Sequence, residues 1–108
     1  MTKNTGTITR EGHRVAILGD VNPDNRKQLL ELTTQAMSTP WDGRCYIDLH
    51  GAGYIDASGI ATLIRLARDA KVKGVELLIA NASPEFRQLI EKTAALHDVF
   101  TFAEATSA

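Results

Sequence analysis

The chain has little of what several functional classes require. It has one cysteine among 108 residues, so no disulfide can form within it, and this is typical of a reducing cytosol. Its 12 Lys and Arg residues are balanced by 13 Asp and Glu residues, whereas nucleic-acid binding needs a basic excess or stripe. No apolar run approaches the roughly 18 residues of a membrane span, and residues 2–12 are too polar for a signal peptide. We therefore expect a cytoplasmic protein with no nucleic-acid partner and no membrane insertion.

What the chain does have is enough for one folded domain. Surface scaling predicts that about 65% of the unfolded surface is buried at this length, and hydrophobic residues at 44% supply the core. Cys45 is expected in that core as a small buried hydrophobe. We expect a single domain over residues 1–108, with a core at about residues 8–103 and flexible termini at residues 1–6 and 104–108.

Alternating apolar residues predict an opening hairpin, with strands at residues 8–10 and 14–19. The run Asn22-Pro23-Asp24 is typical of a helix start, because proline suits the first helical position and Asn22 can cap it. The helical period then continues to Thr39-Pro40, which ends the helix. We expect Trp41 to close this helix over the core.

Strands and helices alternate over the rest of the chain. The nearly continuous apolar run at residues 75–80 is typical of a strand covered on both faces. Strand–helix–strand connections of this length predict parallel pairs with right-handed crossovers. The predicted segments are a strand at 45–49, a loop with two glycines at 50–57, a helix at 58–73 ended by Gly74, a strand at 75–80, a helix opened by Ser83-Pro84-Glu85 with Phe86, Leu89, Ile90 and Thr93 inward, and a strand at 99–102. The predicted fold class is α/β, with a mixed sheet of about five strands, the opening hairpin plus parallel strands, covered by three to four helices.

Motifs for cofactors and metals are incomplete. Gly51 and Gly53 follow a predicted strand, but Asp56 stands where a dinucleotide fingerprint needs its third glycine, and a carboxylate there would repel a pyrophosphate. No Gly-Lys-Ser/Thr follows, as a P-loop requires. None of the three histidines has a Cys or His at ligand spacing. We expect no cofactor and no metal.

A serine-hydrolase site is incomplete as well. The elbow G-x-S-x-G has Asp56 and Ile60 in place of its glycines around Ser58. His50 could approach Ser58 as a base, with Asp48 or Asp56 orienting it, but nothing in the spacing demands this. We therefore expect a protein that is not an enzyme.

Ser58 has two interpretations. A serine before an apolar-periodic run is most often an N-cap, which satisfies an unpaired N–H of the first helical turn. A hydroxyl at a helix N-terminus, beside Gly59 with no side chain, is also accessible to the active site of another protein. A phosphate there would meet free N–H groups and the positive end of the helix dipole.

Short motifs in the middle of the chain carry a resemblance to a known family. A strand ending Ile47-Asp48-Leu49 is followed by Asp56-Ala57-Ser58-Gly59, which matches a D-x-S-G motif ahead of an amphipathic helix. Upstream, Gly19-Asp20-Val21-Asn22 takes the place of a G-[D/E]-[L/V/I]-D turn. Over about residues 8–103 the chain resembles the STAS domains, and most closely the bacterial anti-sigma factor antagonists. The resemblance implies the STAS fold.

In that family, the serine matching Ser58 is phosphorylated by a partner that is both an anti-sigma factor and an ATP-dependent serine kinase. The unphosphorylated antagonist binds this partner and frees the sigma factor, and a PP2C-type phosphatase restores the serine. This chain departs from the family pattern twice, since Ala57 replaces a frequent second serine and Asn22 replaces the usual acid. The resemblance places these residues at the partner surface: Asp20, Asn22, Tyr54, Asp56, Ala57, Ser58, Gly59, Ile60, Thr62 and Arg65.

The resemblance leaves a second hypothesis open. The chain would then be a STAS regulatory subunit of a transporter or of a stress-signalling scaffold, with no phosphoswitch at its serine. A neighbouring gene for a histidine-kinase-like ATPase would favour the first hypothesis, and a gene for a transporter permease would favour the second.

A phosphate on Ser58 would add about −1.5 to −2 charges at neutral pH. We expect Asp56 to lie about 6–7 Å away, so that its repulsion and the attraction of the helix terminus nearly cancel. The phosphate would then act at the interface with the partner rather than on the fold. Arg65 and Arg68 are expected to border that docking surface.

Overall fold

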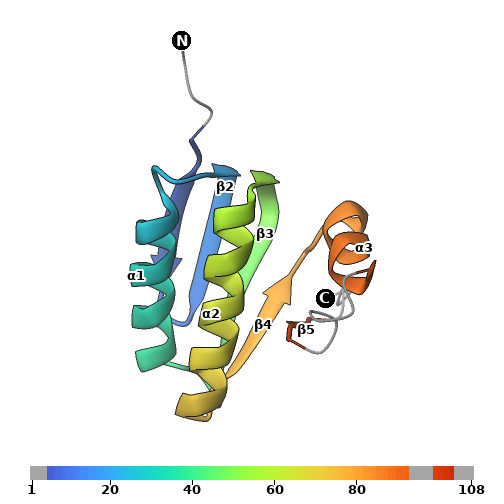
Figure 1. Ribbon diagram of the computed structural model, residues 1–108. Helices are drawn as coiled ribbons and strands as arrows, with labels where there is room; N and C mark the ends of the chain where they lie inside the picture. Colours follow the sequence, from blue (N-terminus) through green and yellow to red (C-terminus); the bar gives the residue numbers. More distant parts are fainter. Residues whose placement is uncertain (1–4, 93–98, 104–108) are drawn as a thin grey trace.

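Five strands form one sheet in the computed structural model, which describes residues 5–92 and 99–103 (Figure 1). The strands lie in chain order, with the first pair antiparallel and the other neighbours parallel. The elements are β1 (Thr7–Glu11), β2 (Arg14–Val21), α1 (Arg26–Ser38), β3 (Arg44–Ile55), α2 (Ala57–Lys73), β4 (Glu76–Ala80), α3 (Pro84–Lys92) and β5 (Thr101–Phe102). The predicted mixed sheet with an opening hairpin is therefore confirmed.

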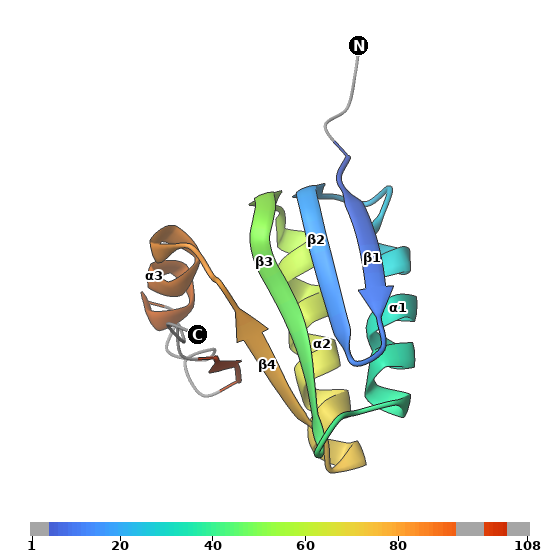
Figure 2. The ribbon, with the colours of Figure 1, turned by 180° about the vertical axis from the view of Figure 1, so that it is seen from behind.

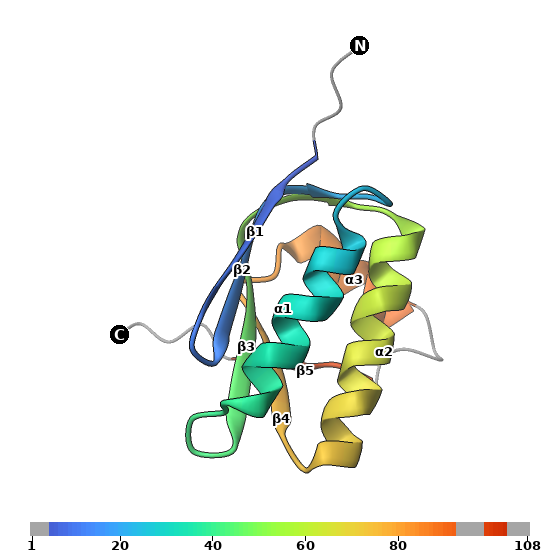
Figure 3. The same ribbon diagram turned by 90° about the vertical axis from the view of Figure 1, so that its left-hand side faces the viewer.

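The two long helices cover one face of the sheet. Because the strand order never reverses, right-handed crossovers bring successive helices to the same side. Figure 3 shows α1 and α2 side by side on that side, and Figure 2 shows β1, β2 and β3 from behind with no helix in front. In β4, exposed Glu76 and half-buried Leu78 alternate with Leu77 and Ile79, which are buried. The expectation that this strand is covered on both faces is wrong.

The core lies between the sheet and these two helices. The helical periods predicted from the sequence are confirmed, since Leu29 and Ala36 of α1 and Leu63 and Ala67 of α2 are buried. Cys45 is buried in β3 as expected, and burial raises the pKa of its thiol to about 11, which keeps it protonated at neutral pH. Among the described residues, no helix is both long and apolar enough to span a bilayer.

Several side chains and boundaries differ from the sequence prediction. Trp41 is 64% exposed and stacks on His13, with ring centroids 6.0 Å apart, so it does not close α1 over the core. Leu89 of α3 is 50% exposed rather than inward. Val99 lies in a turn before β5. Of the predicted flexible ends at residues 1–6 and 104–108, residues 1–4 and 104–108 lie outside the described residues, as does Thr93. Thr5 and Gly6 are paired with Asp20, through a β-bridge and a hydrogen bond from the Gly6 N–H at 2.8 Å.

β3 is longer than predicted. It runs from Arg44 to Ile55, and the glycine-containing segment predicted as a loop is its second half. This half stays paired with β2 as far as the pair Val21 and Ile55, through two shifts of register that each add one residue on β3. β4 pairs with Arg44–Asp48 only. The second half of β3 therefore projects beyond β4.

A buried amide fixes the start of α1. Asn25 is 4% exposed, and its Nδ2 donates hydrogen bonds to the carbonyl oxygens of Gly6 and Asp20, both at 2.9 Å. Its Oδ1 accepts a hydrogen bond from the Asn22 N–H at 3.0 Å. The segment before β1, the end of β2 and the turn into α1 thus meet at one side chain. α1 begins only at Arg26, so Pro23 lies in the preceding turn and not in the helix.

We expect Asn25→Ala to lower the free energy of unfolding by about 2–3 kcal/mol, because it removes three hydrogen bonds to half-buried backbone groups. Urea denaturation followed by circular dichroism measures the change. The matched control is Gln28→Ala on the exposed face of α1, for which we expect less than about 0.5 kcal/mol. Equal effects of the two substitutions would contradict the role assigned to Asn25.

Candidate functional site

The first turn of α2 begins directly after β3 and carries Ser58. Asp56 is the N-cap residue, with an extended backbone at φ −77° and ψ 177°, and its Oδ1 accepts a hydrogen bond from the Gly59 N–H at 2.8 Å. The same Oδ1 accepts a hydrogen bond from the Ser58 hydroxyl, also at 2.8 Å. The N-cap role predicted for Ser58 is therefore wrong, because helix α2 begins at Ala57 and the acid before it provides the cap.

These contacts change the expected electrostatics of the motif. The Ser58 hydroxyl and the Asp56 carboxylate are in direct contact at 2.8 Å, whereas the expected separation of about 6–7 Å is between Asp56 and a phosphate on Ser58. The Gly59 N–H, then the Ser58 hydroxyl, lower the pKa of Asp56, and the charge of Arg26 acts in the same direction. The Asp56 carboxylate is therefore ionised at neutral pH, and the hydroxyl proton of half-buried Ser58 is used in the hydrogen bond to it.

Gly59 allows α2 to start this close to the sheet. It is buried, and a Cβ at this position would come within 2.8 Å of side-chain atoms of both Val21 and Ile55. The Asp56 N–H donates to the Val21 carbonyl at 3.2 Å, which continues the pairing of β2 with β3 into the helix start. Gly59 therefore allows close packing of α2 against the sheet. The sequence prediction assigns it to the partner surface, where its missing side chain would leave the Ser58 hydroxyl accessible.

The ends of β2 and β3 bring the other predicted residues to the same end of the sheet. The Asp20 carboxylate accepts a hydrogen bond from the Tyr54 N–H at 2.7 Å, and the Tyr54 side chain is 71% exposed. Asn22 follows β2 directly and donates through its side-chain amide to the Thr5 hydroxyl at 3.0 Å. These three residues and the start of α2 form what we call the switch end of the domain.

The remaining predicted residues lie along α2. Ala57 is exposed, and Ile60 is half-buried against the core. The Thr62 hydroxyl donates to the Ser58 carbonyl at 2.9 Å. Farther along, exposed Arg65 lies 3.9 Å from the Asp69 carboxylate. The candidate surface thus extends from the switch end along the first half of α2.

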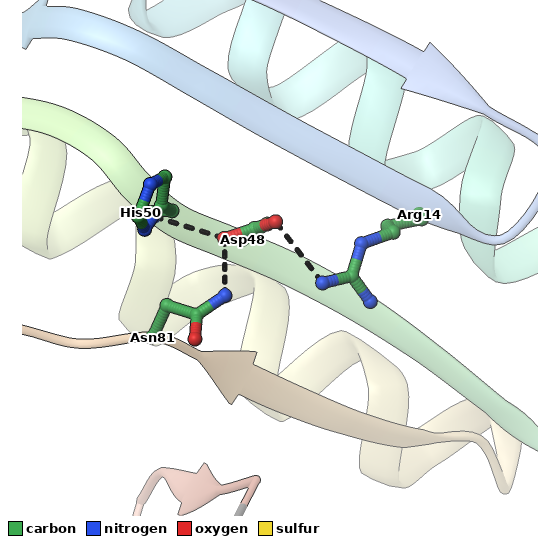
Figure 4. A network of polar contacts seen from close by, with 4 residues as sticks. All are labelled: Arg14, Asp48, His50 and Asn81. Atoms are coloured by element: carbon green, nitrogen blue, oxygen red, sulfur yellow. Dashed lines mark hydrogen bonds and ion pairs between the residues drawn. The ribbon is translucent and has the colours of Figure 1, made fainter. Parts of the chain in front are cut away.

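Two residues of the hydrolase hypothesis, Asp48 and Ser58, have hydrogen-bond partners other than a histidine side chain. Asp48 lies on the open face of the sheet, where its carboxylate accepts hydrogen bonds from Arg14, the His50 N–H and the Asn81 amide (Figure 4). Partial burial raises the pKa of Asp48, but these hydrogen bonds outweigh it and leave the pKa lowered. The Ser58 hydroxyl is bonded to Asp56 instead of a histidine. Over residues 5–92 and 99–103, no three His, Cys, Asp or Glu side chains gather as a metal site.

Comparison with known families identifies the fold. A family model described as Mlab, STAS domain, matches residues 5–99. The chain belongs to the STAS domain family. The resemblance carried by the D-x-S-G motif is thereby confirmed at the level of the family.

Solved structures of low sequence identity share this STAS fold. The anti-sigma factor antagonist SpoIIAA in its unphosphorylated form is 14% identical, with a TM-score of 0.65 over 94% of this chain and 90% of that chain. The phosphorylated form of the Bacillus cell fate determinant SpoIIAA gives 14% identity and a TM-score of 0.64 over 94% and 93%. A chain in the complex of the diguanylate cyclase SiaD with its activator SiaC, from Pseudomonas aeruginosa, is 18% identical with a TM-score of 0.63 over 95% and 93%.

Sequence reasoning missed two features that shape the site. The predicted cap at Asn22 is wrong, because Asn25 is the N-cap residue of α1; an asparagine two residues after a proline at a helix start is a signal for a cap or turn amide. The sequence prediction places Leu89 in the core and therefore does not indicate the pocket that Leu89 lines between β3 and α3. The pattern of apolar residues in α3 does not indicate that the Leu89 side chain is exposed.

The lowered pKa values of Asp48 and Asp56 make stability depend on pH. Each ionised carboxylate stabilises the fold above the unfolded pKa of about 3.9, and this contribution is lost as the pH falls through the lower folded value. We expect Asp48→Asn and Asp56→Asn each to reduce the loss of stability between pH 5 and pH 2, measured by urea denaturation. Asp42→Asn, at an exposed position, is the control and should leave the acid limb unchanged. If both variants lose as much stability as the wild type between pH 5 and pH 2, the two carboxylates do not cause the pH dependence.

Proposed function

We propose that this STAS domain is an anti-sigma factor antagonist whose partner binding is switched off by phosphorylation of Ser58. In the unphosphorylated state it binds an anti-sigma factor that is also an ATP-dependent serine kinase, and so releases the sigma factor. A PP2C-type phosphatase returns Ser58 to the binding state. On this proposal the domain is a cytoplasmic binding module and not an enzyme.

The observation that carries the proposal is the position of Ser58. Its hydroxyl lies in the first turn of α2 and donates to Asp56, at the end of the sheet where Asp20 accepts the Tyr54 N–H. The similarity to SpoIIAA supports the proposal, because that protein has been solved in both unphosphorylated and phosphorylated forms. In this chain Ala57 leaves Ser58 as the one hydroxyl of the D-x-S-G motif.

The contact between Ser58 and Asp56 supplies a mechanism for the switch. Transfer of a phosphoryl group to the Ser58 oxygen removes the proton that Asp56 accepts, and it places negative charge beside a carboxylate whose pKa is already lowered. The Gly59 N–H, now bound to Asp56 at 2.8 Å, becomes a donor for which carboxylate and phosphate compete. Phosphorylation therefore rearranges the helix cap as well as the charge presented to the partner.

A second candidate function is a regulatory subunit that binds a transporter or a signalling enzyme without a phosphoswitch. It is favoured by the structural use of Ser58, whose hydroxyl is already bonded within the cap. The similar chain in the complex of SiaD with its activator SiaC is consistent with a STAS-like fold acting on an enzyme partner. In this case Ser58→Ala and Ser58→Asp should change partner binding to the same small extent.

The two candidates are separated by kinase and binding assays on the full chain. Incubation with the candidate kinase and ATP, followed by mass spectrometry, should place phosphate on Ser58. We expect Ser58→Ala to retain the affinity of the unphosphorylated protein and phosphorylation to lower it at least about 100-fold, because a buried dianion meets a surface shaped for a hydroxyl. Ser58→Asp should weaken binding about tenfold or more.

Ser38→Asp is the matched control for added charge, because Ser38 is an exposed serine at the far end of α1. It should leave partner affinity unchanged. Phosphate found on Thr62 or Ser83 with Ser58 unmodified would reject the assignment. Charge reversal at Arg65 and Arg68 together is expected to weaken binding, and unchanged affinity would remove the two arginines from the docking surface.

A further inference from the structure

The second half of β3 has an edge that no described strand occupies. β4 pairs with β3 only as far as Asp48 and Ala80, whereas β3 continues to Ile55 and is held on its other side by β2. Figure 1 shows this end of β3 facing α3, with no strand drawn between them. Such an edge presents backbone N–H and C=O groups in the spacing that an added strand requires.

A pocket lies between this edge and α3. Its volume is about 190 Å³, and its lining is mostly apolar, with Leu49, Ala52 and Ile55 from β3 and Phe86 and Leu89 from α3. Tyr54 lines it too. We call this feature the β3–α3 groove.

The volume of the groove limits what it can hold. Small-molecule and cofactor sites usually measure about 300–1,000 Å³, which is larger than this pocket. A cavity of about 150 Å³ lined by apolar side chains holds one benzene ring. The groove therefore fits a single aromatic or large aliphatic side chain, and a free strand edge runs beside it.

The charges around the groove indicate which charge a bound segment carries. Glu85 is the one charged residue among those that line the pocket. One further carboxylate lies next to its β3 wall, since Asp20 accepts the Tyr54 N–H, whereas the Asp56 carboxylate is held by Ser58 and Gly59 at the start of α2. An apolar slot with an acidic border is complementary to a segment that carries a large apolar side chain and a basic residue.

We propose that the β3–α3 groove binds an extended segment of the partner protein, with one aromatic side chain in the pocket and a basic residue at the acidic border. The segment would add to the free edge of β3 as a further strand. The groove is continuous with the switch end, because Tyr54 lines the pocket and Asp56 and Ser58 follow within the next residues. This inference rests on the proposed function, because it assigns the segment to the anti-sigma factor and kinase that phosphorylates Ser58.

The probe for the groove is the peptide acetyl-Val-Thr-Phe-Thr-Arg-Thr-amide, titrated to about 2 mM into the isotopically labelled full chain and followed by amide chemical shifts. Shift changes should concentrate in Gly51–Ile55 and Ser83–Leu89. Replacing Phe by Ala in the peptide should weaken binding about tenfold or more, and replacing Arg by Glu should also weaken it. No binding, equal binding of the three peptides, or shifts on the open face of the sheet would overturn the proposal.

Variants of the domain test the same groove from the other side. Leu89→Asp, at a position that is 50% exposed, should weaken peptide binding about tenfold or more, and Tyr54→Ala provides a second variant at a 71% exposed position. Val72→Asp is the matched control, because Val72 is 89% exposed on α2 and does not line the pocket. Unchanged affinity in both groove variants would reject the groove as the binding site.

Kinase assays separate this inference from the proposed function. If Ser58 is phosphorylated and controls binding, but Leu89→Asp and Tyr54→Ala bind the kinase with wild-type affinity, the groove proposal fails and the switch stands. If the peptide binds in the groove but the kinase neither binds the domain nor modifies Ser58, the proposed function fails and the groove stands as a peptide site for another partner.

Discussion

The extended pairing of β2 with β3 determines where the candidate functional residues lie. It continues to Val21 and Ile55, well past the end of β4, and the Asp56 N–H adds one more backbone bond to β2. The end of β2, with Asp20, is thereby fixed against the start of α2, with Ser58. The same excess length leaves the other edge of β3 unpaired among the described residues. One local feature of the sheet thus produces both the switch end and the groove beside it.

Around Ser58, the helix cap and the proposed switch involve the same atoms. Asp56 accepts from the backbone of the first helical turn and from the hydroxyl proposed as the phosphate acceptor. Buried Gly59 keeps this turn against Val21 and Ile55, so the cap cannot move far without disturbing the core. A modification of Ser58 would therefore rearrange the structure only locally, because the surrounding contacts are short and closely packed.

The sequence was sufficient for the element order, the mixed sheet and most of the core, because these depend on hydrophobic periodicity and on short connections. It placed Ser58 at a helix N-terminus but assigned the cap to the wrong residue, since aspartate and serine both favour that position and only the backbone angles decide between them. It also read residues 50–55 as a loop, because glycines interrupt the apolar pattern by which a strand is recognised. Their pairing with β2 depends on register, which is a tertiary property.

Trp41 lies at the start of β3, next to Arg44, whereas Ser58 follows the end of that strand. It is the only tryptophan of the chain, it is exposed, and it stacks on His13. Its fluorescence therefore reports on the end of the domain opposite the switch. If its emission changes when a partner binds near Ser58, the binding alters the structure at the opposite end of β3. If its emission stays the same, the surroundings of Trp41 do not respond to binding at the other end of the strand.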